Sequence, residues 1–450
     1  MIKSINPYTN ETIEKFKQDS KSSVNKKIKL ADKTFQTWSK TDYSRKKTLM
    51  LQLAKELKKN KNDYALAITR EMGKPISQAV AEIEKCAWVC EYYAENAKAQ
   101  LKPQEIQTDA KKSYVRFDPI GSVLAVMPWN YPFWQVFRFA VPSLMAGNVC
   151  LLKHSTNVMR SAENIQQAFI NAGFPEGCFQ NLIIKSGKVE DVIRNKRVKA
   201  VTLTGSKAAG SSVASIAAEE IKKSVLELGG SNALVVFEDA KIDETIKTCV
   251  QARFQNTGQS CIAGKRLLIH ESIYLNFIER FITEVRELKS GSPEDEDTFI
   301  GVMASEKLAK ELEQQLRNSV EKGAKIILGG KRSKAYFEPT VVINVHKKSP
   351  LFEEETFGPV MAVTSFKTDM AALDLINRSK FGLGVSIFTE DLERAKAMIP
   401  QIEDGAVFIN EMVKSDPRLP FGGTKDSGYG RELSSFGIHE FVNKKTVYIK

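Results

Sequence analysis

Residues 201–237 read VTLTGSKAAGSSVASIAAEEIKKSVLELGGSNALVVF and decide the fold class. The apolar runs VTLT, SVLEL and NALVVF predict strands, and the segment KAAGSSVASIAAEEIKK between the first two has the apolar spacing of a helix. Strands that alternate with helices in this way favour parallel sheets covered on both faces. The stretch therefore predicts an α/β fold.

The same alternation continues in both directions along the chain. Further strands are predicted at residues 122–127, 148–153, 178–184, 266–270, 325–330, 340–345, 360–366, 385–390 and 406–410. Two such series predict two sheet-centred domains. Residues 23–100 instead have helical spacing, and IQTDAKKSYVRFDPIG (106–121) alternates like a hairpin arm.

Composition limits the class of protein. The 450 residues are 42% hydrophobic and 27% charged, as in soluble globular proteins of two or three domains, which excludes a collagen-like or largely disordered chain. The net charge of +12 favours anionic ligands. Because the lysines are interleaved with acidic residues, we expect a solvated surface, and a nucleic-acid-binding protein is the remote alternative.

Sequence features also indicate where the protein acts. No apolar run reaches the ~18 residues of a membrane helix, and the polar start MIKSINPYTNETIEKF lacks the apolar core of a signal peptide. The six cysteines are scattered without a C-x-x-C pair, which is typical of reduced thiols. The four histidines lie far apart, so no metal site is expected. The sequence predicts a cytoplasmic protein with no membrane partner.

A glycine turn joins the first strand of the opening stretch to its helix. Gly205 and Ser206 stand at the junction, where the amides of a helix N-terminus suit a phosphate group. The G-x-G-x-x-G fingerprint and the phosphate loop of nucleotide hydrolases are both absent. A plain helix N-cap at Ser206 is the alternative.

Cys261 lies in the segment FQNTGQSCIAGKR, between Gly258 and Gly264. Polar residues precede it, so this segment is not a typical core strand. Because Lys265 and Arg266 follow closely, we expect a lowered thiol pKa and a nucleophilic role. An inert core cysteine is the alternative.

Three further polar residues are candidates for a catalytic or binding role. Glu227 lies in the nearly apolar SVLELGG, which favours a raised pKa and a general base, or else a salt-bridged strand end. Asn130 follows the strand exit VLAVMPW and either caps the next helix or donates to an oxyanion. Glu355 in EEETFGPV is either a solvated loop acid or an acceptor for sugar hydroxyls.

The combination of motifs resembles the aldehyde dehydrogenase superfamily. PWNYP, LLKHST, LTGSKAAG, LELGG, NTGQSC, ETFGP and PFGGTKDSGYGRE occur in the order and spacing of that family over essentially the whole chain. WQVFRFAVPSLMAGN and NTGQSCIAGKR look most like the succinate-semialdehyde dehydrogenase branch. The resemblance implies two Rossmann-like sheet domains plus a small β oligomerisation arm.

The resemblance also implies catalytic roles. Cys261 would add to the aldehyde carbon, and Asn130 with the Cys261 backbone N–H would hold the oxyanion. Hydride transfer to a nicotinamide would leave a thioester, which water activated by Glu227 would hydrolyse.

A cofactor site follows in the same way. Lys153 would contact the adenosine ribose, Gly205 and Ser206 the pyrophosphate, and Glu355 the nicotinamide ribose, with Phe357 beside the ring. The complete set expected along the cofactor is Trp129, Lys153, Ser155, Thr156, Gly205, Ser206, Leu228, Glu355 and Phe357.

Thr156 carries the prediction of cofactor preference. The family commonly has a Glu at this position, which accepts from the ribose hydroxyls of NAD and repels the 2′-phosphate of NADP. Because Thr156 has no charge, we expect NADP to be preferred, with NAD use possible.

The resemblance implies a substrate and an assembly as well. The expected reaction oxidises succinic semialdehyde to succinate, with Arg138 and Ser415 holding the distal carboxylate. Arg138 lies one helical turn from Trp134, so both side chains are expected to face the same tunnel; a structural ion pair of Arg138 is the alternative. Another small aldehyde, or a CoA-acylating reaction, is the alternative function. The expected assembly is a homodimer or homotetramer.

The expected division of the chain follows from the resemblance. A dinucleotide-binding domain would comprise 1–102 and 122–228, and a catalytic domain 229–432. An oligomerisation arm with the C-terminal strand would comprise 103–121 and 433–450.

Overall fold

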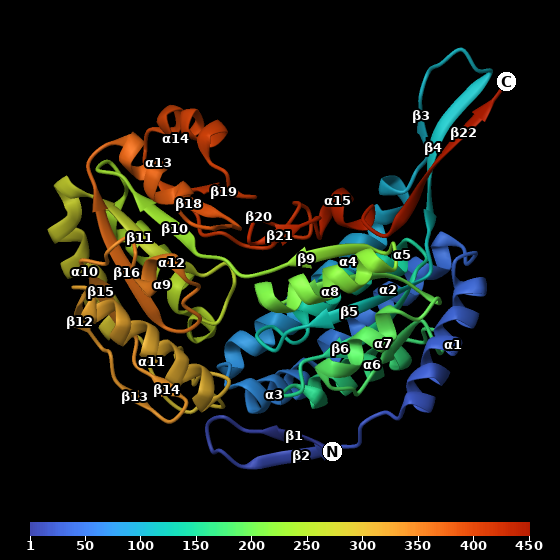
Figure 1. Cartoon of the computed structure of the whole chain (residues 1–450), viewed down its shortest axis with the longest axis horizontal. Coiled ribbons are helices and arrows are strands. Elements are labelled where there is room, and N and C mark those ends of the chain that lie inside the picture. The colour runs from blue at the N-terminus through green and yellow to red at the C-terminus, as the bar shows by residue number, and fades with distance from the viewer.

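Two open sheets form the body of the computed structural model, which describes residues 1–450 (Figure 1). The first sheet has the order β21-β9-β8-β5-β6-β7 and is parallel except for β21. Its strands are β5 (Ser122–Met127), β6 (Val149–His154), β7 (Phe179–Asn181), β8 (Val198–Thr204), β9 (Lys223–Glu227) and β21 (Gly428–Tyr429).

The second sheet has the order β12-β15-β16-β11-β10-β18-β19, and only the edge strand β12 runs antiparallel to its neighbour. Its strands are β10 (Asn232–Val236), β11 (Gly264–His270), β12 (Lys325–Leu328), β15 (Thr340–Ile343), β16 (Val360–Phe366), β18 (Val385–Phe388) and β19 (Val407–Ile409). The structure confirms the predicted α/β class.

Helices cover both sheets, and the first four precede any strand of the large sheets. These are α1 (Lys21–Trp38), α2 (Tyr43–Lys59), α3 (Lys61–Met72) and α4 (Ile76–Gln100). The remaining helices are α5 (Trp134–Met145), α6 (Met159–Asn171), α7 (Val189–Ile193), α8 (Lys207–Glu219), α9 (Ile242–Phe254), α10 (Tyr274–Arg286), α11 (Glu306–Glu321), α12 (Pro350–Glu353), α13 (Asp369–Asn377), α14 (Leu392–Met398) and α15 (Ser434–Ile438). No helix has the length and apolar character that crossing a membrane requires.

Short elements complete the chain. An N-terminal hairpin comprises β1 (Ile2–Ile5) and β2 (Thr12–Phe16). Two further pairs join β13 (Arg332–Ser333) to β14 (Tyr336–Phe337) and β17 (Phe381–Gly382) to β20 (Thr424–Lys425). Single 3-10 turns span Ser186–Lys188, Gln255–Gly258, Glu271–Ile273 and Ile399–Gln401.

The second sheet is buried on both faces, as its continuous apolar strands predict. In β10 the side chains of Ala233 and Val235 enter one apolar cluster, and those of Leu234 and Val236 enter another. This division follows from the two-residue period of a strand, which sends successive side chains to opposite faces. The sheet is therefore held rigidly between two helical layers.

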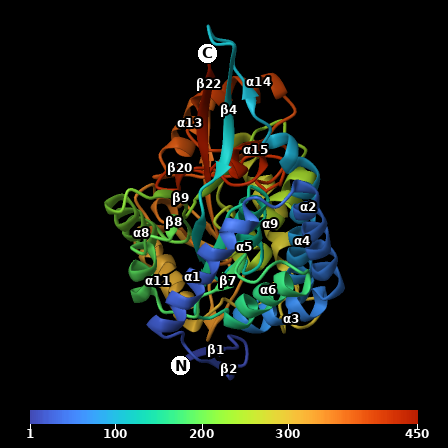
Figure 2. The same ribbon diagram turned by 90° about the vertical axis from the view of Figure 1, so that its right-hand side faces the viewer.

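A separate three-stranded sheet extends from the body. It pairs β22 (Val442–Ile449) with β4 (Lys112–Pro119), and β4 with β3 (Gln104–Glu105). The β4–β22 ribbon projects at the end of the molecule opposite the N-terminal hairpin in both views (Figures 1 and 2). The sheet lies within the two segments expected for the arm, and its role in assembly stays a prediction.

One strand shows that the chain returns to the first sheet near its end. β21, which falls within the range expected for the catalytic domain, pairs antiparallel with β9. This pairing brings the segment around Glu432 close to the end of β9, where Glu227 is the last residue.

Candidate active site

Cys261 stands at the start of the second sheet, in the turn between α9 and β11. The loop before it has left-handed backbone at three successive residues: Asn256 (φ 53°), Thr257 (φ 53°) and Gly258 (φ 70°). Such a conformation is unfavourable for a β-branched threonine and persists only where the surroundings impose it. The surroundings therefore hold this loop in an unfavourable conformation that positions Cys261.

Buried hydrogen bonds hold this loop in place. The Asn256 amide N–H donates to Gln78 Oε1 (2.6 Å), and Asn256 Nδ2 donates to the carbonyl of Asn130 (2.9 Å). Gln259 Oε1 accepts from the amide of Ala304 (2.9 Å). A side chain at Gly258 would also lie 2.4 Å from the carbonyl of Gly358. These contacts fix the strained backbone from several elements at once.

Two cavities meet at Cys261. The larger, of about 320 Å³, contains Cys261 together with Trp134, Arg138 and Ser415, so the structure brings these four predicted residues to one cavity. The smaller, of about 170 Å³, also reaches Cys261. Its other lining residues are Pro128, Trp129, Asn130, Gln135, Thr204, Gly205, Ser206, Leu228, Gly229, Glu355 and Phe357. Cys261 therefore lies between the larger cavity, which we call the tunnel, and the smaller one.

The expectation of a lowered Cys261 pKa is wrong. Burial raises the pKa of this thiol to about 11, against the opposing effect of Arg138 and Lys265. Lys265 Nζ donates to the carbonyls of Ser260 (2.7 Å) and Cys261 (2.8 Å). Arg266 donates to the carbonyl of Ser231 (2.9 Å). Both cations therefore hold backbone, and the thiol is protonated near neutral pH.

Glu227 is the buried carboxylate at the end of β9. Burial and the neighbouring Glu432 raise its pKa, while Arg138 and Arg431 act in the opposite direction. Neither of its carboxylate oxygens has a hydrogen-bond partner. The alternative of a salt-bridged strand end is not what the structure shows, because no ion pair of Glu227 is present.

Asn130 does not cap the following helix. Its Nδ2 donates to the carbonyl of Gln259 (3.1 Å), two residues before Cys261. The cap of α5 is Glu82, whose Oε1 accepts from the amides of Phe133 (2.8 Å) and Trp134 (3.0 Å). An amide NH₂ has two hydrogens, so one remains for an oxyanion. The Cys261 amide N–H has no acceptor within the protein.

The second cavity suits a dinucleotide. Gly205 and Ser206 precede α8, and Ser206 Oγ caps it by accepting from the Ala209 amide (3.3 Å). Thr204 Oγ1 is buried there without a partner. Trp129 and Phe357 pack edge to face, with ring centroids 5.6 Å apart. Aromatic walls beside free helix-terminal amides favour a ring and a phosphate group together.

Glu355 is fixed at the mouth of this cavity. Its Oε1 accepts from the Gly230 amide (3.0 Å) and lies 3.4 Å from Lys265 Nζ. A side chain at Gly229 would come within 2.4 Å of Glu355, and one at Gly230 within 2.6 Å of the Cys261 carbonyl. Gly229 and Gly230 therefore allow their own segment to approach those of Glu355 and Cys261 closely.

Lys153, the penultimate residue of β6, is a cation without a partner. It is 6% exposed, burial lowers its pKa, and no hydrogen bond or ion pair holds its Nζ. The next residue, His154, is fully buried and places Nε2 2.9 Å from the carbonyl of Pro132. Ser155 Oγ donates to Asn157 Oδ1 (2.7 Å), while Thr156 makes no side-chain hydrogen bond. An anionic or hydroxyl ligand would satisfy Lys153.

Arg138 forms a buried ion pair with Glu432 and stacks on Phe421, with its guanidinium 4.3 Å from the ring centroid. The predicted alternative of a structural ion pair is therefore present, although Nη2 remains buried without a hydrogen bond. Ser415 Oγ accepts from Trp134 Nε1 (2.9 Å). The predicted role of both residues toward a carboxylate stays a prediction.

Two residues of this cavity were missed by the sequence reasoning. Lys85 from α4 donates to Ser415 Oγ (2.9 Å), and Glu82 from the same helix caps α5. The one signal available was their placement, since Glu82 and Lys85 lie beside the buried residues Ile83 and Cys86. This signal is weak, because charged residues of an amphipathic helix normally face solvent.

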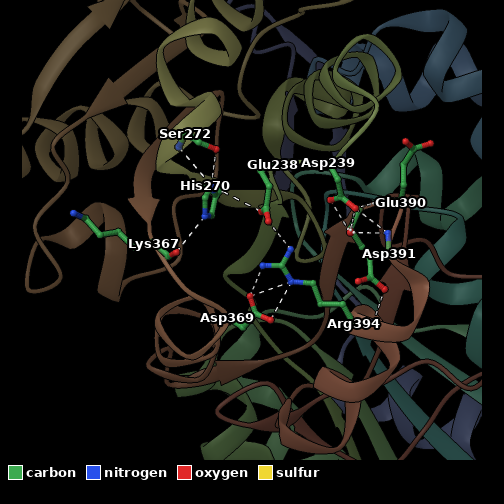
Figure 3. Close-up of polar contacts among 10 residues, drawn as sticks. Glu238, Asp239, His270, Ser272, Lys367, Asp369, Glu390, Asp391 and Arg394 are labelled. Atoms are coloured by element: carbon green, nitrogen blue, oxygen red, sulfur yellow. Dashed lines mark hydrogen bonds and ion pairs between the residues drawn. The ribbon is translucent and has the colours of Figure 1, made fainter.

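The opposite end of the second sheet is closed by polar contacts. At the carboxyl ends of its central strands, Arg394 bridges Asp369 (3.0 Å) and Glu238 (2.9 Å) (Figure 3). Asp239 accepts from Thr389 Oγ1 (2.8 Å) and from the amides of Glu390 and Asp391 (2.9 Å each). Ligands of open α/β sheets usually bind at this end. Here Cys261 lies at the amino end instead.

Comparisons with known proteins agree with this geometry. The family model described as "Aldehyde dehydrogenase family" matches residues 1–447. A succinate-semialdehyde dehydrogenase of Mycobacterium tuberculosis, named for NADP(+), is 43% identical over 454 residues that cover 100% of this chain and 99% of the relative. A succinate semialdehyde dehydrogenase of Escherichia coli, named for NAD(P)+, is 42% identical over 99% of this chain and 97% of its own.

A solved structure shares the fold over its full length. The succinic semialdehyde dehydrogenase of Streptococcus pyogenes, crystallised in complex with NADP+, superposes with a TM-score of 0.97 at 34% identity and covers 100% of both chains. The chain belongs to the aldehyde dehydrogenase family.

Proposed function

We propose that this chain oxidises succinic semialdehyde to succinate with NADP as the oxidant. The observation that carries the proposal is the position of Cys261 between two cavities, one lined by Arg138 and Ser415 and the other by Gly205 and Ser206. An aldehyde with a distal carboxylate fits the first cavity and a dinucleotide the second. Relatives named for this substrate and for NADP support both assignments.

Addition to the aldehyde needs a thiolate and an oxyanion site. Cys261 holds its proton near neutral pH, so a base must take the proton as the C–S bond forms. Glu227 suits that role, because its raised pKa makes it a stronger base than an exposed carboxylate. The electrons of the C=O bond move to oxygen, where Asn130 Nδ2 and the Cys261 amide would donate.

Oxidation and release then follow. Bound NADP would supply the hydride acceptor, and loss of hydride from the former aldehyde carbon would re-form the C=O bond as a thioester. Once Glu227 has released the Cys261 proton to solvent, it takes a proton from water as the water oxygen bonds to that carbon; the Cys261 thiolate then leaves and recovers a proton from Glu227. The products are the carboxylate and the free thiol. Because Glu227 is present, hydrolysis is favoured over transfer to CoA.

For the adenosine ribose we propose the segment of Lys153 and Thr156, which offers a cation and no acid. Lys153 has no partner and Thr156 carries no charge, so the additional phosphate of NADP meets attraction without repulsion. The N-terminus of α8 suits the pyrophosphate.

The test combines substrates, cofactors and two variants. The wild-type enzyme should oxidise succinic semialdehyde in preference to butanal, and should use NADP in preference to NAD. Cys261→Ala should abolish turnover while NADP binding, followed by fluorescence, stays near wild type. Glu227→Gln should slow both proton removal from Cys261 and hydrolysis of the thioester; above about pH 9, where hydroxide can take the thiol proton, a burst of NADPH should precede a slow steady state. Normal steady-state turnover of Glu227→Gln without a burst would refute the hydrolytic base.

We also propose a cytoplasmic enzyme that assembles as a homodimer or homotetramer. Six free cysteines, five of them buried, support a reducing compartment. The projecting β4–β22 ribbon supports assembly, because a strand pair that leaves the body gains burial from a second subunit (Figure 1). Light scattering of the purified protein at several concentrations tests the assembly.

A further inference from the structure

The larger cavity contains four cationic side chains, and they differ in their partners. Three of them have an acidic partner in the protein: Lys74 with Glu82, Arg138 with Glu432, and Lys414 with Glu411. Lys85 has none within 4.0 Å. A cation that lines a cavity without a counter-ion is placed for an anionic ligand.

The contacts of Lys85 hold it in the cavity. Its Nζ donates to Ser415 Oγ (2.9 Å) and lies 4.4 Å from the centroid of the Trp134 ring. Ser415 also accepts from Trp134 Nε1. Because an ammonium has three hydrogens, this arrangement leaves donors for a carboxylate. α4, α5 and the segment that contains Ser415 therefore hold the Lys85 ammonium at the tunnel.

The local electrostatics agree with that placement. Burial lowers the pKa of Lys85 to about 8, and Arg138 adds to the effect. A carboxylate bound beside Lys85 would offset both the lost hydration and the repulsion from Arg138, because it supplies an opposite charge. Glu82 and Asp416 are the acids that face Lys85 at longer range and act in the opposite direction.

We infer that Lys85 binds the distal carboxylate of the substrate and so determines the preference for aldehydes that carry one. This inference rests on the proposed function of the cavity. Arg138 is committed to Glu432, so Lys85 supplies the charge that the protein itself leaves unpaired.

Matched aldehydes test the inference. Succinic semialdehyde and butanal have the same carbon skeleton and differ in the carboxylate. Lys85→Met should raise KM for succinic semialdehyde by about tenfold or more, the factor expected for one charge-assisted hydrogen bond, and leave KM for butanal within about twofold. Lys85→Arg should recover most of the loss. The control is Lys98→Met, an exposed lysine on the same helix.

The pH profile gives a readout that a merely structural role would not change. KM for succinic semialdehyde should rise as pH passes about 8 in the wild type, because Lys85 loses its proton there. The rise should be absent for butanal and for Lys85→Arg. An equal effect of Lys85→Met on both aldehydes, or no effect on either, would overturn the inference. A wild type without preference for succinic semialdehyde would instead overturn the proposed substrate.

Discussion

The buried pair of Lys74 and Glu82 allows a quantitative prediction about how the substrate cavity is held. Lys74 is fully buried, and its Nζ bonds to Glu82 Oε2 and lies 3.6 Å from the centroid of the Tyr131 ring. Glu82 Oε1 caps α5 at Phe133 and Trp134. Glu82 therefore connects α4 to the helix that carries the tunnel residues.

Glu82→Gln removes the charge but keeps an oxygen that can accept from α5. It leaves Lys74 as a buried cation without a carboxylate, which costs about 3–5 kcal/mol. The Tyr131 ring stays in contact with the stranded ammonium, so a cost at the lower end, about 3 kcal/mol, is expected. In a domain of this size that amounts to a fall in apparent Tm of roughly 6–12 °C.

The direction in which a second substitution changes the apparent Tm is a more specific test. Lys74→Met added to Glu82→Gln should raise the apparent Tm above that of Glu82→Gln alone, because it removes the stranded charge. Thermal unfolding followed by fluorescence at one protein concentration measures all variants. Lys58→Met, which breaks the exposed pair with Glu91 on α4, is the control and should shift the free energy of unfolding by less than ~0.5 kcal/mol. If Glu82→Gln is no worse than this control, or if the double variant is the least stable, the reasoning fails.

Three further predictions concern the active site. Thr156→Glu should shift kcat/KM from NADP toward NAD, since a carboxylate there accepts from ribose hydroxyls and repels a phosphate; a wild type that prefers NAD tenfold would show that another segment sets the choice. Alkylation of Cys261 by iodoacetamide in the free enzyme should still accelerate above about pH 9, because the thiol pKa is raised to about 11, and a plateau below pH 8 would contradict this. Burial lowers the pKa of His154 to about 4, so it is neutral in the fold and contributes stability of up to ~3 kcal/mol that is complete above about pH 6.5 and is lost as pH falls toward 4; His154→Asn should flatten the fall in Tm over that window.

The sheets could be predicted from the sequence because their strands carry a local signal. The apolar runs at 122–127 and 360–366 coincide with β5 and β16, since both strands are buried on two faces. β21 carries no such signal. It has two residues, Gly428 and Tyr429, and forms because the chain returns to the edge of β9. Pairing that depends on tertiary approach is not contained in a local pattern.

The residues of the larger cavity also divide into those that local sequence predicts and those that depend on tertiary packing. Trp134 and Arg138 share one face of α5, so helical spacing alone places them together. Lys85 comes from α4 and donates directly to Ser415 across a long separation in sequence, beside the Trp134 ring. The surface lysines of α4, such as Lys98, have the same residue type. Only the packing of α4 on α5 distinguishes a cavity lysine from a solvated one.

The error about Cys261 has a physical origin. Sequence proximity placed Lys265 and Arg266 beside the thiol, but both lie on β11, and both donate to backbone carbonyls that would otherwise be unpaired. Lys265 still lowers the thiol pKa, but the effect of burial is larger. Proton removal from Cys261 therefore depends on a base from outside its own segment. Glu227 fits that requirement, because its oxygens have no hydrogen bond that would oppose protonation and its own pKa is raised by the same burial.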